Sequence, residues 1–95
     1  MKTEELFEAI EQQTGLTREQ VTSKCRNEEL VFARRIICYY LNMHNATQRT
    51  IASTLNIDRA TVSYNLCHHE SEYKYNPKYR AMFDIAANCL EKPCC

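Results

Sequence analysis

One glycine and two prolines in 95 residues leave this chain few places at which to turn sharply. Its apolar residues recur at three- and four-residue spacings, which is typical of amphipathic helices that bury one face. No run alternates apolar and polar residues between turn signals, as a half-exposed strand would. The sequence therefore predicts an all-α fold of five to six helices, with residues 1–95 forming a single domain.

Polar residues at capping positions divide the chain into these helices. Short polar side chains accept hydrogen bonds from the first amides of a helix, and glycine or asparagine allows the left-handed turn that ends one. The first helix is expected to begin after Thr3 and end at Gly15, and the helix after Asn27 is expected to be the longest. The expected N-caps are Thr17, Asn27, Thr47, Asp58 and Asn76, the last followed by Pro77. Residues 91–95 are expected to form a flexible tail.

Two segments carry clear buried stripes. Between residues 28 and 43 the stripe consists of Leu30, Ala33, Ile37, Tyr40 and Leu41. In the closing helix it consists of Tyr79, Met82, Phe83, Ile85, Ala86 and Leu90. Cys38 lies in an apolar stretch and is expected to be a small core residue. Arg34 and Arg35 lie off the first stripe, so both are expected on the surface.

The chain is neutral overall, which disfavours indiscriminate binding to nucleic acid, because such binding depends on phosphate neutralisation by basic residues. The charges are unevenly distributed, however. Residues 1–17 hold one basic and four acidic residues, residues 18–66 hold seven basic and four acidic, and residues 67–95 hold four of each. An acidic N-terminal helix (1–16) therefore offsets a basic centre in the total.

The stretch TIASTLNIDRATVSYNL, residues 50–66, lies in this basic centre and is typical of a helix-turn-helix. Ala52 is small where two helices must cross closely. Asn56 stands where a left-handed residue ends the first helix, and Asp58 is placed to cap the second. Ile57 and Val62 have the spacing of a hydrophobic staple. Two helices that merely pack in a small core remain the alternative interpretation.

The outer face of the second helix is expected to read DNA. With Val62 inward, about 100° per residue turns Ala60, Tyr64 and Cys67 outward, with Thr61, Ser63 and His68 beside them. Small and polar side chains at a helix start suit the floor of a major groove. The residues expected to contact bases or phosphates are Lys24, Arg26, Arg34, Arg35, Gln48, Arg49, Asp58, Arg59, Ala60, Thr61, Ser63 and Tyr64.

Residues 18–90 resemble the C-terminal DNA-binding domain of the bacterial replication initiator DnaA, a family that shares its fold group with the Trp repressor. The segments that carry the resemblance are SKCRNEELVFARRIICYYL and IDRATV. It implies a recognition helix in the major groove and a basic-loop arginine in the minor groove. Arg26 matches that loop arginine and Arg34 a phosphate-contacting arginine, while residues 58–61 match the signature Asp-His-Thr-Thr.

Departures from that signature imply a different target sequence. Arg59 replaces the histidine, Ala60 replaces the first threonine, and the turn is one residue shorter than the family's and lacks its glycines. No nucleotide-binding loop of the type Gly-x-x-x-x-Gly-Lys is present, so this chain is not expected to act as an ATPase by itself.

Double-stranded DNA is thus the expected partner of a small cytoplasmic regulator of transcription or replication, from a bacterium, phage or mobile element. The alternative is a protein-interaction module, a replication or transcription adaptor that uses the same fold without reading DNA. The acidic N-terminal helix is expected to close the core, although it could instead contact a second copy or another replication or transcription protein.

Other chemistry is not expected. Three histidines and six cysteines lack the paired spacing of a zinc site, and His68 and His69 are expected to point in opposite directions. Reduced thiols are the simplest interpretation, with Cys25, beside two basic residues, as an alternative redox sensor. No catalytic constellation, cofactor or small-molecule substrate is indicated, and no apolar run approaches the roughly 18 residues that span a membrane.

Overall fold

The computed structural model describes residues 3–23 and 27–91, with side chains placed for residues 4–23 and 27–88. Six helices form this part of the chain, and it contains no strand. They are α1 (Thr3–Thr14), α2 (Arg18–Thr22), α3 (Glu28–Met43), α4 (Gln48–Leu55), α5 (Arg59–Tyr75) and α6 (Pro77–Glu91). The all-α prediction is confirmed.

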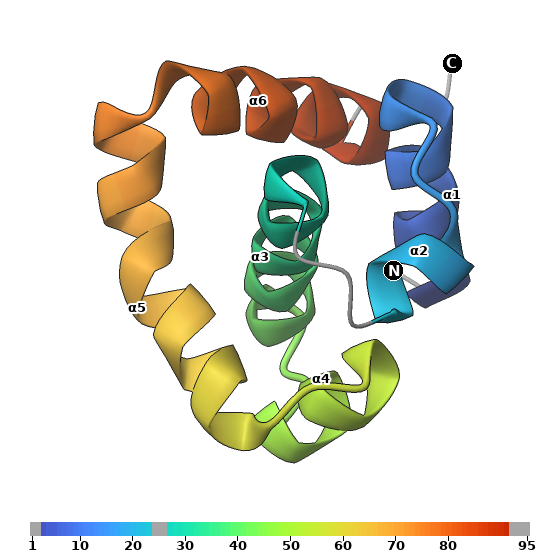
Figure 1. Ribbon diagram of the computed structural model, residues 1–95, viewed down its shortest axis with the longest axis vertical. Coiled ribbons are helices and arrows are strands. Elements are labelled where there is room, and N and C mark those ends of the chain that lie inside the picture. Colours follow the sequence, from blue (N-terminus) through green and yellow to red (C-terminus); the bar gives the residue numbers. More distant parts are fainter. Residues whose placement is uncertain (1–2, 24–26, 92–95) are drawn as a thin grey trace.

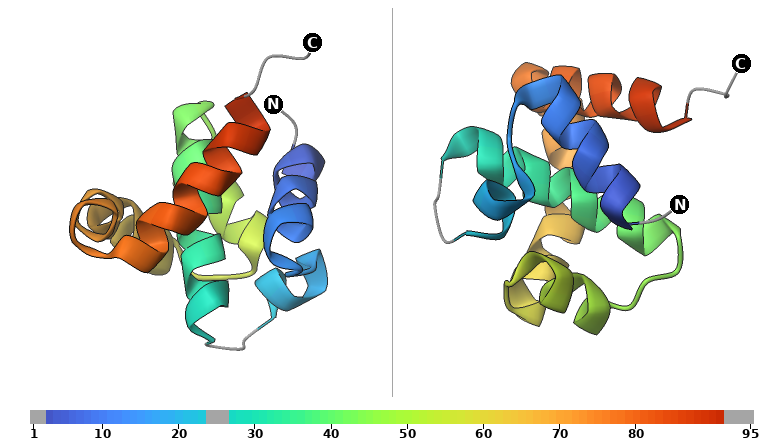
Figure 2. Two further views of the ribbon diagram at one scale, coloured as in Figure 1. Left: turned by 90° about the horizontal axis from the view of Figure 1, so that it is seen from above. Right: turned by 90° about the vertical axis from the view of Figure 1, so that its right-hand side faces the viewer.

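The central helix is α3, which contacts each of the other five helices. In Figure 1, α5 and α6 form two sides of a frame around it, α1 and α2 form a third, and α4 lies below. The perpendicular views of Figure 2 show α1 and α6 side by side, in agreement with their direct contact. The expectation that the helix after Asn27 would be the longest is wrong, since α5 has 17 residues and α3 has 16.

The predicted helix boundaries rest on local hydrogen bonds. Gly15 adopts φ 77° directly after α1, a conformation that glycine tolerates. Thr17 and Gln20 form a reciprocal capping box at the start of α2. Asn27 accepts a hydrogen bond from the Glu29 amide at 3.1 Å. The same arrangement recurs at the start of α4, where Thr47 caps through the Thr50 amide, and at α6, where Asn76 caps through the Lys78 amide.

Apolar residues from all six helices form one core, with α3 at its centre. From α1, Leu6, Phe7 and Ile10 are buried, so this helix closes the core as expected. Cys38 is fully buried, and its predicted core position is confirmed. Among the described residues, no helix is both long and apolar enough to cross a membrane.

Two arginines are buried that the sequence placed on the surface. Arg34 is 8% exposed and Arg35 is 6% exposed, although both lie off the predicted stripe. The expectation was wrong because α3 is surrounded by helices and has almost no solvated face along its middle. The opposite error concerns Ile85, which was assigned to the buried stripe of α6 and is 45% exposed.

Candidate nucleic-acid interface

The turn between α4 and α5 is held by backbone geometry at Asn56. This residue has φ 57° and ψ 46°, the left-handed conformation expected at that position. The next amide, of Ile57, then donates to the Ala52 carbonyl at 3.0 Å and satisfies one of the last carbonyls of α4. The short turn thereby sets the direction in which α5 leaves α4.

Asp58 occupies the N-cap position of α5 but does not cap it with its side chain. Its backbone is extended, with φ −75° and ψ 154°, as an N-cap requires. Its carboxylate makes no capping hydrogen bond, so the expectation that it satisfies the free amides of α5 is wrong. Asp58 is exposed, and the carboxylate lies toward solvent beside the positive end of the helix.

The crossing of α4 and α5 is apolar, as the helix-turn-helix interpretation requires. Leu55 and Val62 are fully buried, and Ala52 is 7% exposed. Ile57 is half-buried and packs against the same core, which is consistent with the predicted staple to Val62. These contacts anchor the inner face of α5. The opposite face of its first two turns remains exposed to solvent.

The outer face of α5 is arranged as the helical spacing predicts. Arg59, Ala60, Thr61, Ser63 and Tyr64 are exposed, and Cys67 and His68 continue the exposed face. Tyr64 is 56% exposed, and its ring stacks on that of His68 with 4.0 Å between centroids and 19° between planes. The short side chains of this face are therefore bordered by Arg59 at one end and by the stacked Tyr64 and His68 rings at the other.

A polar hollow of about 650 Å³ opens beside this face. It lies between the end of α2, the first half of α3 and the start of α5. Its lining includes Ser23, Arg34, Arg35, Asn56, Thr61 and Tyr64. The hollow therefore lies between Ser23, the residue directly before residues 24–26, and the first turns of α5.

Arg34 fastens the end of α2 to α3. Its Nε donates to the Val21 carbonyl at 2.7 Å and its Nη2 to the Ser23 carbonyl at 2.6 Å. Carbonyls at a helix end lack partners within the helix, so the guanidinium satisfies groups that would otherwise be costly to bury. Arg34 thus holds the position from which the chain enters residues 24–26.

Arg35 links α3 to the middle of α5. Its Nε donates to Oδ1 of Asn65 at 3.3 Å, and its Nη1 lies 3.7 Å from a Glu72 carboxylate oxygen. Asn65, 5% exposed, also directs its Nδ2 toward the Cys38 sulfur at 3.9 Å. Burial raises the pKa of Cys38 to about 12. The Asn65 hydrogen bond and the Arg35 charge act in the opposite direction, but their effect is smaller. The sequence analysis missed Asn65, although a polar residue three positions after Val62 on the buried stripe was a usable signal.

The other predicted contact residues divide into two groups. Gln48 and Arg49 are exposed in the first turn of α4, at the end of that helix opposite to the turn that leads into α5. Lys24 and Arg26 lie outside the described residues, as does Cys25. Among the residues that the structure places, Arg49 and Arg59 are thus the exposed arginines of the helix-turn-helix.

The two neighbouring histidines point in opposite directions, as expected. His68 is exposed, whereas His69 is half-buried and its Nδ1 lies 2.7 Å from the Tyr79 hydroxyl. The His69 ring stacks on Tyr39 with 4.0 Å between centroids. Burial, followed by the charge of Arg35, lowers the pKa of His69. Within the described ranges no group of three His, Cys, Asp or Glu residues is placed to hold a metal ion.

Comparison with known families agrees with this geometry. The family model for the bacterial dnaA protein helix-turn-helix matches residues 3–67. The chain belongs to this family. The match begins at α1 and ends within α5, whereas the resemblance seen in the sequence was placed over residues 18–90. No curated protein and no solved structure gives a match.

Membership in the DnaA helix-turn-helix family makes this chain a DNA-binding helix-turn-helix domain. The family's domain binds DNA and is not a catalytic one. The matched range includes α1, so the acidic helix is part of the family's own helical unit here. The family match therefore favours a DNA-binding helix-turn-helix over the alternative of two helices that merely pack in a small core.

Proposed function

We propose that this domain reads a specific double-stranded DNA sequence by placing the first two turns of α5 in the major groove. The observation that carries the proposal is the exposed face formed by Arg59, Ala60, Thr61, Ser63 and Tyr64, on a helix whose inner face is fixed by Val62 and Asn65. Short side chains let the helix backbone approach the base edges closely. Arg59 at the helix start is long enough to reach a guanine or a phosphate.

The flanking contacts follow from the position of the hollow. Gln48 and Arg49, at the start of α4, are proposed to hold phosphates on one side of the major groove. Arg26 and Lys24 are proposed to reach the minor groove or its rim, because Ser23, directly before them, lines the same hollow as Thr61. A phosphate backbone passing this hollow would separate the two grooves being read.

Arg34 and Arg35 are assigned a positioning role in place of the phosphate contacts expected from the sequence. Both side chains are largely buried, and each donates to protein acceptors. If either guanidinium turned toward a phosphate, its buried hydrogen-bond acceptors would lose their partner, which is costly. Arg34 is proposed to set the end of α2, and Arg35 to set the position of α5.

Charge favours a selective binder. The basic centre lies on the helix-turn-helix side, and the exposed Glu4, Glu8 and Glu11 of α1 oppose phosphate elsewhere. Non-specific affinity is set mainly by phosphate contacts, so a neutral domain gains little from random duplex. We propose a cytoplasmic regulator of replication or transcription from a bacterium, phage or mobile element, in which base contacts supply most of the discrimination.

Selection of bound duplexes from a random pool tests this function directly. An enriched sequence, whose affinity greatly exceeds that for scrambled duplex at physiological salt, is the expected result. A palindromic sequence would indicate binding as a dimer. No binding to any duplex at low salt or at physiological salt would contradict the proposal and favour an adaptor that uses this fold to bind protein.

A further inference from the structure

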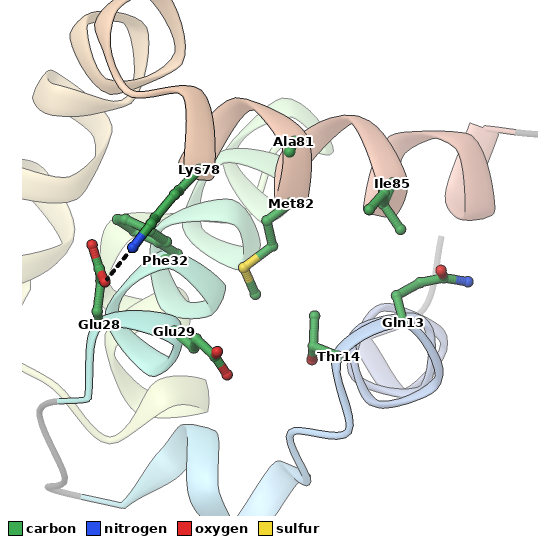
Figure 3. A pocket seen from close by; sticks show the side chains of 9 residues that line it. All are labelled: Gln13, Thr14, Glu28, Glu29, Phe32, Lys78, Ala81, Met82 and Ile85. Carbon is green, nitrogen blue, oxygen red and sulfur yellow. Dashed lines mark ion pairs between the residues drawn. The ribbon is translucent and has the colours of Figure 1, made fainter.

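An apolar groove opens on a side of the molecule distant from the helix-turn-helix. It has a volume of about 460 Å³ and lies where the C-terminal end of α1, the start of α3 and the first half of α6 meet. Figure 3 shows Phe32 and Met82 along its floor, with Thr14 facing Met82 across the groove and Ile85 further along α6. In Figure 1, α6 and α4 lie on opposite sides of α3.

Ile85 is the feature of this groove that packing within the chain does not explain. It is 45% exposed, whereas Phe32 beneath the groove is 7% exposed and Met82 is half-buried. The lining of the groove thus includes an exposed aliphatic side chain next to a flexible thioether. Methionine adapts its shape to a partner and contacts aromatic rings favourably, so the floor suits an inserted ring.

The charge at the rim of the groove is negative. Glu28 and Glu29 line one wall, and Lys78 from α6 lies 3.8 Å from a Glu28 oxygen. Within the described residues Glu29 has no ion pair. Acidic residues stabilise the start of a helix, which accounts for their presence but leaves the Glu29 carboxylate available to a cation. The groove therefore fits a segment with an apolar side chain next to a basic one.

The chain itself presents such a segment at the corner between α5 and α6. Tyr75 is 74% exposed, the highest value among the large hydrophobic side chains that the structure describes. The Nζ of Lys74 lies 5.5 Å from the centroid of the Tyr75 ring, so a cation and an aromatic ring are presented together. The corner is ordered by the Arg80 guanidinium, which donates to the carbonyls of Tyr73 and Lys74.

We propose that this corner of one molecule docks into the groove of a second copy of the chain. Tyr75 enters beside Met82 and Ile85, and Lys74 pairs with Glu29. Charge complementarity selects this occupant: the groove offers the Glu29 carboxylate, which has no ion pair among the described residues, and the corner offers Lys74 beside the exposed Tyr75 ring. Neither surface includes a residue assigned to DNA contact, so a molecule bound to DNA can recruit another copy.

Because the corner and the groove are different surfaces, mutants defective in each can be combined in one experiment. Ile85→Lys blocks the groove and Tyr75→Ser removes the ring, and both positions are exposed, so the fold is retained. Sedimentation velocity of the full chain is expected to show self-association that weakens by about tenfold or more in either variant alone. Mixing the two variants is expected to restore a dimer, because one intact corner then meets one intact groove.

Met43→Lys serves as the control, since Met43 is 52% exposed at the far end of α3 and belongs to neither surface. It is expected to associate like the unmodified chain, and helical circular dichroism confirms folding of all variants. A monomeric unmodified chain at high concentration would overturn the proposal. So would self-association that survives either substitution, or variants that fail to complement each other when mixed. The duplex affinity of each variant is measured separately and is expected to remain unchanged.

Discussion

The Nε of Arg35 on α3 donates to the Asn65 side chain on α5, and this buried bond joins the central helix to the proposed recognition helix. Asn65 is one residue from Tyr64, which lies on the exposed face. Rotation of α5 about its axis would break the bond, because only one face of the helix can present Asn65 to α3. The bond therefore couples the stability of the core to the direction in which the reading face points.

Removal of this bond should reduce both stability and DNA affinity. Asn65→Ala leaves a buried guanidinium with the Glu72 carboxylate and the Tyr79 ring as its remaining side-chain partners, and the expected loss in free energy of unfolding is about 1–3 kcal/mol. Urea denaturation measures the loss, and fluorescence anisotropy with the selected duplex measures binding. Asn88→Ala, at an exposed position on α6, is the matched control and should change neither quantity.

Arg59 should contribute to sequence discrimination. Arg59→Ala is expected to cost about 1–3 kcal/mol of binding free energy on the selected site and to relax the preference at one base pair. Arg49→Ala should weaken binding to all sequences alike and lower the slope of log affinity against log salt by about one. Equal losses on selected and scrambled duplex for Arg59→Ala would contradict its assignment to base reading.

Arg26 provides the test of the minor-groove contact. Arg26→Ala is expected to weaken binding by about 1–3 kcal/mol on the selected site, with a loss of preference in base pairs outside those that α5 reads. Competition between duplexes that differ only in these flanking pairs measures the change. Unaltered affinity and unaltered flank preference in this variant would rule out the proposed contact.

At the left-handed turn residue Asn56, substitution by alanine should destabilise the domain more than substitution by glycine. Asn56→Ala places an ordinary side chain at φ 57° and is expected to destabilise the domain by about 1 kcal/mol. Asn56→Gly tolerates that conformation, so the change should be smaller. Thermal unfolding of the two variants gives the comparison. A more stable alanine variant would mean that the turn can adopt another conformation.

Stability should decline in mild acid because of His69. Its folded-state pKa is lowered from the usual 6.5 by burial and by the Arg35 charge, so the unfolded chain binds more protons once the pH falls below about 6.5. The free energy of unfolding therefore decreases as the pH drops from 6.5 toward the lowered value. His69→Phe should flatten this part of the pH profile.

Thiol reactivity should follow burial. The Cys38 thiol is fully buried and has a pKa raised to about 12, so almost no thiolate forms near neutral pH. Cys67 is exposed on α5. Alkylation of the native protein, followed by mass spectrometry, is expected to modify Cys67 and spare Cys38. Modification of Cys38 at a comparable rate would show that α5 opens from α3 readily.

Features set by neighbours in the sequence could be predicted from the sequence alone. The ends of helices at Gly15 and Asn56, the caps at Thr17 and Asn27, and the outward face of α5 depend on backbone conformation and helical periodicity within a few residues. The same local logic predicted the helix-turn-helix, whereas its family was indicated by a resemblance to known sequences. A contact between adjacent turns needs no knowledge of the rest of the fold.

The roles of individual charged and apolar side chains were decided by tertiary structure. Arg34 and Arg35 lie off the apolar stripe of α3, yet five helices surround α3 and bury both. Ile85 fits the stripe of α6, yet it faces a groove that the neighbouring helices leave open. Periodicity specifies which residues share a face, but burial also depends on how many helices pack around that face. Only the assembled fold shows that α3 is enclosed and that the groove beside α6 remains accessible.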